Sequence, residues 1–181
     1  FLRDGKPVAT HAWRIDARDA GSAQRKGFTH ADAVYLITPD RFANGDPSND
    51  SVAGLREAAN RKDPNGRHGG DIAGIRQHLD YIAALGFTQV WPTPMLENDQ
   101  PAYSYHGYAI TDLYKTAPRM GTHEDVRALS REAKARGIGI VMDIVLNHIG
   151  SQHWWMRDLP AKDWINNGDT FVETNHRRTT I

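Results

Sequence analysis

The sequence predicts an α/β fold that forms the first part of a (β/α)8 TIM barrel. Short apolar runs alternate with stretches of helical periodicity, in the order strand, helix, strand, helix, strand. Long polar loops leave the strands and the returns from helix to strand are short, which is typical of a barrel whose site is built from the loops after the strands. A doubly wound sheet is the alternative, but no Gly-x-Gly-x-x-Gly sequence follows the first strand. Three strands cannot close a barrel that normally takes ~250 residues, so we expect the chain to be part of a longer protein.

The composition excludes several classes of protein. The 181 residues carry 22 basic and 22 acidic side chains and no cysteine. Zero net charge argues against a nucleic-acid partner, and the absence of cysteine excludes disulfides and thiolate chemistry. No apolar run approaches the ~20 residues of a membrane helix, so we expect no membrane partner. The first residues do not resemble a signal peptide, and a start without Met suggests a processed or excised segment.

The first strands and the linker before them are predicted from local patterns. Residues 1–28 contain an alternating stretch, Val8 to Ile15, which predicts the last strand of an earlier domain followed by a linker. Residues 33–37 form a compact apolar strand that Pro39 stops. The next predicted strand, 87–91, is cut off at Pro92.

Two helices are predicted, one between these two strands and one after the second strand. Asp71 caps the first, Gly86 ends it, and its apolar positions are Ile72, Ile75, Leu79, Ile82 and Leu85. Thr122 caps the second with Asp125 at the capping-box position, and Gly137 ends it. Its inward-facing positions are Val126, Leu129 and Ala133.

The stretch 137–148 combines a nearly unbroken apolar run, typical of a strand buried on both faces, with polar residues. Asp143 interrupts the run, and Asn147 and His148 follow where the strand emerges. Because ligands bind at the carboxyl ends of parallel strands, these residues are candidates for a functional site. Alternatively, Asp143 satisfies a neighbouring loop and His148 is an ordinary strand-end histidine.

The loop 40–70 is dense in oxygen-bearing side chains that calcium prefers. The candidate ligands are Asn44, Asp46, Asn49, Asp50, the carbonyl of Gly69, and Asp71. The EF-hand pattern does not fit, and Asn, Asp and Gly also favour turns. From spacing alone, turns explain this loop better than a metal site.

Four motifs follow one another along the chain. They are Asp-Arg-Phe-Ala-Asn-Gly-Asp-Pro at 40–47 with Gly-Gly-Asp at 69–71, Gly-Phe-Thr-Gln-Val-Trp at 86–91 with Thr-Pro at 93–94, Tyr-His-Gly-Tyr at 105–108 with Thr-Asp at 111–112, and Asp-Ile-Val-Leu-Asn-His at 143–148. They resemble the calcium loop, the second strand, the second-loop signature and the third-strand signature of the α-amylase family of glycoside hydrolases. Within that family the resemblance is to the cyclomaltodextrinase, neopullulanase and maltogenic amylase branch, and it covers residues 29 to about 165.

The resemblance implies a role for each matching residue. Tyr108 would stack on the glucose ring at the cleavage position, and His148 would hydrogen-bond the same sugar. Asp143 would orient the site and pair with an arginine on the next strand, which would explain a buried charge. His106 is either a sugar contact or a residue that fixes the loop, and Asn147 would be structural. The resemblance also favours calcium as the cofactor, bound by the six residues of the 40–71 loop named above.

The resemblance also implies what the chain lacks. A retaining glycosidase needs two carboxyl groups about 5 Å apart. In this family they lie on the fourth and fifth strands, with a third carboxylate after the seventh, so no catalytic residue is expected here. Asp32 and Asp112 match other family positions or none. We therefore expect the 181-residue chain alone to be inactive.

The resemblance implies three regions and one main function. Residues 1–28 would end an N-terminal β-sandwich domain, 29–148 would be the first part of the catalytic barrel, and 149–181 would start an inserted domain after strand 3. The whole protein would be a retaining α-glucan hydrolase that cleaves α-1,4 bonds, with α-1,6 bonds as an option, in cyclodextrins, pullulan or starch oligosaccharides. The alternatives are a calcium-stabilised carbohydrate-binding module without catalysis, a transglycosylase of the same fold and, least favoured, a metal-dependent hydrolase. A homodimer is an option, and a calcium loop slightly favours a periplasmic or secreted protein over a cytoplasmic one.

Overall fold

The computed structural model describes residues 1–168 and 170. Its helices are α1 (Pro39–Phe42), α2 (Ile72–Gln77), α3 (Leu79–Ala84) and α4 (His123–Ala135), with 3-10 helices η1 (Ser22–Gln24), η2 (Pro47–Asn49), η3 (Ser104–His106) and η4 (Trp154–Met156). Its strands are β1 (Leu2–Arg3), β2 (Lys6–Pro7), β3 (Val34–Ile37), β4 (Gln89–Pro92), β5 (Leu96–Glu97), β6 (Asp112–Thr116) and β7 (Gly139–Ile140).

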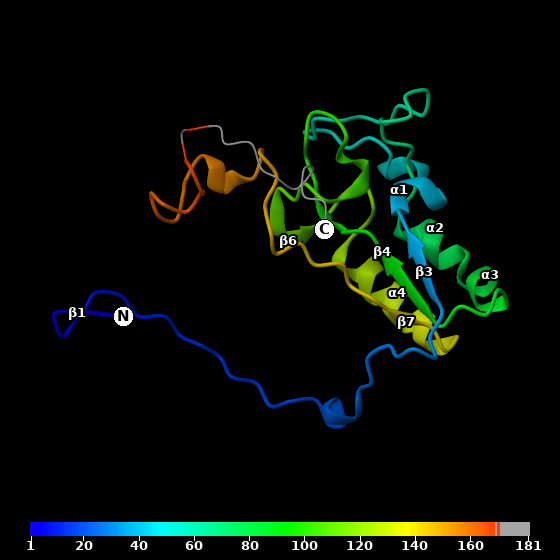
Figure 1. The fold of residues 1–181 in the computed structure, drawn as a ribbon, viewed down its shortest axis with the longest axis horizontal. Coiled ribbons are helices and arrows are strands. Elements are labelled where there is room, and N and C mark those ends of the chain that lie inside the picture. Colours follow the sequence, from blue (N-terminus) through cyan, green and yellow to red (C-terminus); the bar gives the residue numbers. More distant parts are fainter. Residues whose placement is uncertain (169, 171–181) are drawn as a thin grey trace, which may run out of the picture.

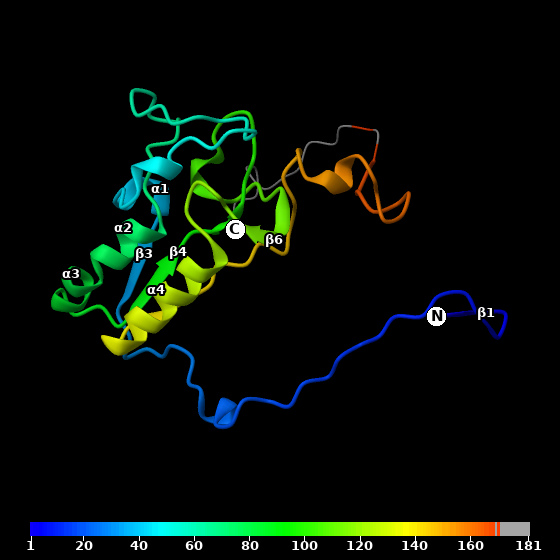
Figure 2. The same ribbon diagram turned by 180° about the vertical axis from the view of Figure 1, so that it is seen from behind.

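A parallel sheet in the order β3-β4-β7 forms the centre of the molecule. Val34 pairs with Gln89 and Ile37 with Pro92, while Val90 pairs with Ile140. Helices α2, α3 and α4 cover one face of this sheet (Figures 1 and 2). Parallel strands whose connecting helices lie on one face are the arrangement of a partial (β/α)8 barrel, so the predicted fold class is confirmed.

The hydrophobic core lies between this sheet and the helices. Its buried members are Ile37, Ile72, Ile75, Leu79, Ile82, Val90, Ala117, Met120, Leu129, Ala133 and Ile138. The predicted inward positions of both helices are therefore confirmed, with Val126 packed against the core. Leu85 is the exception, because its side chain is exposed.

The helix ends follow their capping signals, but one predicted helix is broken. The Asp71 side chain accepts a hydrogen bond from the Gly74 amide, and Thr122 and Asp125 form the predicted capping box. The segment 72–85 is two helices, α2 and α3, because the chain turns at His78, whose Nδ1 lies 2.7 Å from the Gly74 carbonyl oxygen. None of the helices in the described part of the chain is long and apolar enough to cross a membrane.

The predicted strand at Val8 to Ile15 is wrong. Residues 8–19 have no regular structure and are exposed, and the only pairing before them is the short antiparallel ladder of β1 with β2 within the described residues. Figure 1 shows this segment running away from the sheet, and none of the described strands pairs with it.

The prediction of a fully buried strand over 137–148 is also wrong. The strand β7 covers two residues, and beyond it Met142, Ile144 and Leu146 are exposed, Leu146 to 90%. Only β4 pairs with β7 among the described residues, and a strand is buried on both faces only where other elements cover both faces of its sheet. The segment 95–121, between β4 and α4, contains the antiparallel pair β5 and β6, which the sequence pattern does not predict.

Candidate active-site cleft

Three of the predicted site residues meet at the carboxyl end of the sheet. The Tyr108 hydroxyl donates to Oδ2 of Asp143 over 2.7 Å, and Nε2 of His148 lies 2.8 Å from the Tyr108 carbonyl oxygen. A carbonyl can only accept, so Nε2 of His148 carries the proton. The other ring nitrogen, Nδ1, then accepts from Asn147 over 3.1 Å. One tautomer of His148 is thereby fixed.

The environment of Asp143 differs from the prediction. It is partly exposed rather than enclosed in a strand, and it forms no ion pair in residues 1–168 and 170. Its Oδ2 accepts a second hydrogen bond, from Nε1 of Trp91 over 3.0 Å. Burial of Tyr108, together with its hydrogen bond to the Asp143 carboxylate, raises the pKa of Tyr108 to about 12, so its hydroxyl remains a donor.

His106 lies directly against Tyr108. The two rings stack with centroids 5.9 Å apart, and Nδ1 of His106 accepts from the Tyr108 amide over 2.9 Å. Burial lowers the pKa of His106, and the nearby Glu57 carboxylate opposes this shift. A neutral ring that accepts from the backbone matches the loop-fixing role considered for His106.

The loop after β4, which carries Tyr108 and His106, is anchored by contacts with the loop 40–70. The Ser104 amide donates to Glu57 over 2.9 Å, and its hydroxyl accepts from Arg67 over 3.1 Å. Arg67 is buried, and burial lowers the pKa of its guanidinium to about 10. Arg41 lies 3.8 Å from the Tyr105 ring centroid. These contacts join the loop 40–70 to the loop after β4.

Tyr108 and His148 share one cleft, as predicted. A cavity of about 700 Å³ is lined by His106, Tyr108 and His148. A second cavity of about 840 Å³ is lined by Asp143 and His148. Of the described residues that line the two cavities, only Asp143 carries a carboxylate.

Sequence reasoning missed several residues of this region. The sequence predicts Trp91 only as part of a strand, although an indole at the carboxyl end of a strand is a donor near the site. Trp155 and Trp164 line the second cavity, and the only signal for them was the density of tryptophan after residue 152.

The six predicted calcium ligands also lie together. Nδ2 of Asn44 donates to Asp50 over 2.7 Å, and the Asp46 amide and Asn49 both donate to Oδ2 of Asp71. Gly69 has a φ of +88°, and a Cβ there would lie 2.5 Å from the Asp50 carboxylate. Only glycine allows this close approach.

The oxygen ligands of this loop fit calcium, but two observations restrict which of them could bind the ion. The amide oxygens of Asn44 and Asn49 are buried without a hydrogen-bond partner in the described structure, and calcium prefers such neutral oxygens beside carboxylates. Asp71 is already engaged, because its carboxylate accepts from the Gly45, Asp46 and Gly74 amides. No group of three His, Cys, Asp or Glu side chains within the described ranges has metal-binding geometry, so amide and backbone oxygens would have to contribute.

The family is decided by comparison with known proteins. Residues 36–179 match the model of the α-amylase catalytic domain. The chain belongs to the α-amylase family of glycoside hydrolases. The resemblance drawn from the four motifs is thus confirmed.

Relatives in this family include enzymes of the predicted branch. Neopullulanase 2 of Thermoactinomyces vulgaris is 40% identical over 133 residues, covering 71% of this chain and 22% of the relative. The cyclomaltodextrinase of Geobacillus thermopakistaniensis is 34% identical over 150 residues, covering 79% and 25%. The structure of a Geobacillus thermoleovorans α-amylase in complex with acarbose is similar with a TM-score of 0.62 and 40% identity, over 74% of this chain and 27% of that one.

The chain matches only a part of each of these relatives. It spans between 10% and 22% of the length of the first curated relatives. The activity and substrates of the whole protein therefore belong to the proposal below.

Proposed function

We propose that this chain is the glucose-binding part of a retaining α-glucan hydrolase that cleaves α-1,4 bonds in cyclodextrins, pullulan or starch oligosaccharides. The single observation that carries this is the cleft in which Tyr108, His148 and Asp143 are joined by hydrogen bonds. Tyr108 offers an aromatic face to the apolar C–H face of a pyranose, and His148 offers a polar edge to its hydroxyls. Asp143 orients Tyr108 rather than attacking the sugar.

The bond-breaking carboxylates are assigned elsewhere in the protein. Retaining hydrolysis needs a nucleophile and an acid/base about 5 Å apart. The described residues that line the two cavities include a single carboxylate, that of Asp143 in the second cavity. Asp143 is also committed to Trp91 and Tyr108. The 181-residue chain by itself is therefore proposed to be inactive.

An assay on the complete protein tests this proposal. We expect it to release reducing sugar from cyclodextrin, pullulan or starch with retention of the anomeric configuration, and the 181-residue chain to release none. Tyr108→Ala should lower kcat/KM by about 100-fold, because both ring stacking and the contact with Asp143 are lost. Tyr114→Ala is the matched control, since Tyr114 is exposed and lines neither cavity. Equal effects of the two substitutions, or hydrolysis by the chain alone, would refute the assignment.

We further propose calcium at the loop of Asn44, Asp46, Asn49, Asp50, Gly69 and Asp71. The ion would join this loop to the start of α2 and so support the cleft loop, and no catalytic step is assigned to it. Ligand binding to the folded state stabilises by about 2.7 kcal/mol at a hundredfold excess over Kd.

Removing calcium tests this site. Added calcium should raise the melting temperature of the complete protein treated with a chelator, and Asp50→Ala should abolish that rise. Asp16→Ala is the control, because Asp16 lies in the exposed N-terminal segment. A calcium titration by calorimetry that is unchanged in Asp50→Ala would place the ion elsewhere.

A further inference from the structure

Trp91 lies where β4 is hydrogen-bonded to both of its neighbours. On one side the Val141 amide donates to the Val90 carbonyl over 2.8 Å, and on the other the Thr93 amide donates to the Ile37 carbonyl over 2.8 Å. Backbone hydrogen bonds therefore hold the strand immediately before and after Trp91. The direction in which its side chain leaves the strand is thus set by the sheet.

The indole of Trp91 lies on the face of the sheet that the helices leave uncovered. Along β4 the exposure alternates, with Val90 and Pro92 buried and Trp91 38% exposed. Trp91 pairs with Leu36 of β3, which is 58% exposed. Successive side chains of a strand point to opposite faces, so the indole points away from the helical core. Its one polar atom, Nε1, can only donate.

The hydrogen bond from Trp91 ends on the oxygen that also binds Tyr108. Oδ2 of Asp143 accepts from Nε1 of Trp91 over 3.0 Å and from the Tyr108 hydroxyl over 2.7 Å. Trp91 belongs to a strand, whereas Tyr108 lies in a loop, and side chains on strands are held more precisely than those on loops. Oδ1 of Asp143 accepts no hydrogen bond from the described residues. Within that part of the chain, Trp91 is therefore the contact that ties the carboxylate to the sheet.

Trp91 has no direct access to a bound sugar. Tyr108 lines the first cavity of the cleft and Asp143 the second, but Trp91 is absent from the described lining of both. Any influence of Trp91 on a ligand must therefore pass through Asp143 and Tyr108. A hydrogen bond to an ionised acceptor is roughly twice as strong as a neutral one, so it can transmit the fixed position of the strand to the loop.

We propose that Trp91 is a positioning residue of the hydrolytic site. Its N–H group holds the Asp143 carboxylate in the orientation that orders the Tyr108 ring against the reacting glucose. A small misplacement of a positioned group can cost a large factor in rate. This inference rests on the function proposed above and adds to that site a residue that does not touch the sugar.

Steady-state kinetics of the complete protein on maltoheptaose test the role of Trp91. Trp91→Phe keeps an aromatic ring but removes the N–H donor, and it should lower kcat about tenfold with KM changed less than about twofold. Tyr108→Phe keeps the stacking face but removes the hydroxyl donor, and it should have a similar effect. Because both substitutions break the same chain of hydrogen bonds, the double variant should also lose about tenfold rather than about a hundredfold.

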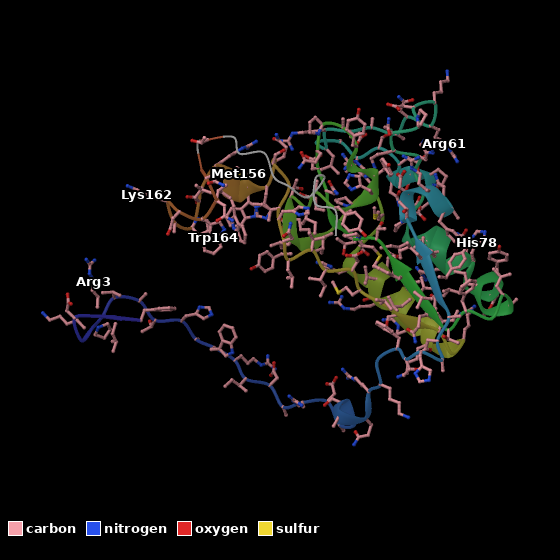
Figure 3. The ribbon with its side chains drawn as sticks, viewed as in Figure 1. Arg3, Arg61, His78, Met156, Lys162 and Trp164 are labelled. Carbon is pink, nitrogen blue, oxygen red and sulfur yellow. The ribbon has the colours of Figure 1, made fainter. Side chains whose placement is uncertain are left out.

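Trp154→Phe is the matched control. Trp154 is 48% exposed, lines neither cavity, and contacts the rings of His153 and Trp155 rather than a carboxylate. It belongs to η4, the short helix that carries Met156 and lies apart from β4 in Figure 3. This substitution should leave kcat and KM unchanged. Melting temperatures of all variants should stay close to that of the wild type.

The indole N–H resonance of Trp91 gives a readout that does not depend on activity. In the NMR spectrum of the complete protein with isotope-labelled tryptophan, the resonance that disappears in Trp91→Phe belongs to Trp91. A hydrogen bond to a carboxylate deshields the donated proton. The resonance should therefore move upfield in Asp143→Ala, in which the acceptor is removed, whereas that of Trp154 should not move.

Five results would overturn the assignment. They are a loss of about a hundredfold in the double variant, a raised KM with unchanged kcat in Trp91→Phe, equal effects of Trp91→Phe and Trp154→Phe, a Trp91 resonance that Asp143→Ala does not move, and a fall in kcat accompanied by a large fall in melting temperature, which would make Trp91 a packing residue. If the wild-type protein hydrolyses no glucan, the function proposed above fails, whereas the resonance still tests the contact between Trp91 and Asp143.

Discussion

Asp143 controls the orientation of two aromatic side chains through a single oxygen. Trp91 and Tyr108 both donate to its Oδ2, from a strand and from a loop respectively. Charge-assisted hydrogen bonds of this kind are roughly twice as strong as neutral ones, so the carboxylate limits the movement of the Tyr108 ring. At the scale of single residues, the cleft is therefore organised by a carboxylate that is left without a catalytic role in our proposal.

A second carboxylate, that of Asp32, accepts several hydrogen bonds at the opposite end of the strands. Its carboxylate accepts from the Thr29 amide over 2.6 Å, from the Thr88 hydroxyl over 2.8 Å and from Gln89 over 3.2 Å. The Thr29 amide contributes most, and together these donors lower the pKa of Asp32 from 3.8 to about 2. They join the segment before β3 to the start of β4.

The pKa of Asp32 predicts how stability depends on pH. Because the folded pKa lies below the unfolded value, the contribution of Asp32 is present above about pH 4 and is lost as the pH falls towards about 2. Asp32→Asn should lower the melting temperature at neutral pH, with a difference from wild type that shrinks across this acid range. Asp16→Asn, in the exposed N-terminal segment, should show no difference at any pH. A difference for Asp32→Asn that is independent of pH would contradict the assignment.

At the scale of elements, α4 is the segment that its sequence predicts best. Its cap, its capping-box partner Asp125 and its inward positions all lie within the helix or next to it, so they act wherever the helix is placed. Predictions failed at two places for different reasons. The break at His78 involves a local contact with the Gly74 carbonyl that the apolar pattern does not reveal, whereas the length of β7 depends on strands far away in sequence that are available to pair with it.

The capping box of α4 supplies a prediction at this scale. The Thr122 side chain accepts from the Asp125 amide over 3.2 Å and donates to the Asp125 carboxylate over 2.6 Å. Thr122→Ala should reduce the free energy of unfolding by about 1 kcal/mol, whereas Thr122→Ser should keep most of it. Denaturant unfolding measures both. Equal losses in the two variants would show that the Thr122 methyl group, not its hydroxyl, stabilises the helix start.

The sequence predicts those residues of the candidate site that lie in recognisable local motifs. Asp143 and His148 are predicted together because they lie at the carboxyl end of one strand, where ligands bind in parallel sheets, whereas Tyr108 is assigned to the same sugar by the resemblance of the motifs. Trp91 and Trp164 were missed, since nothing near them in sequence indicates which side chains they approach. The pairing of β5 with β6 was missed for the same reason.

At the scale of the whole molecule, the two faces of the central sheet differ. Helices cover the face to which Tyr35 and Val90 point, whereas Leu36 is exposed on the other face. Beyond β7, Met142, Ile144 and Leu146 are exposed as well. Contiguous exposed apolar surface of this kind is rare on stable monomers, and an unpaired strand edge promotes association between chains.

We therefore expect the 181-residue chain, when purified by itself, to self-associate. Size-exclusion chromatography with light scattering should give a mass above that of the 20.3 kDa monomer, increasing with concentration. Introducing charge with Ile144→Lys and Leu146→Lys should shift the chain towards the monomer, because an edge that carries lysine resists pairing. Val8→Lys is the matched control, since Val8 is exposed in the N-terminal segment away from the sheet and should leave the mass unchanged. A monodisperse wild-type monomer that unfolds cooperatively would mean that these side chains are packed in solution, and the exposed face of the sheet would then not drive assembly.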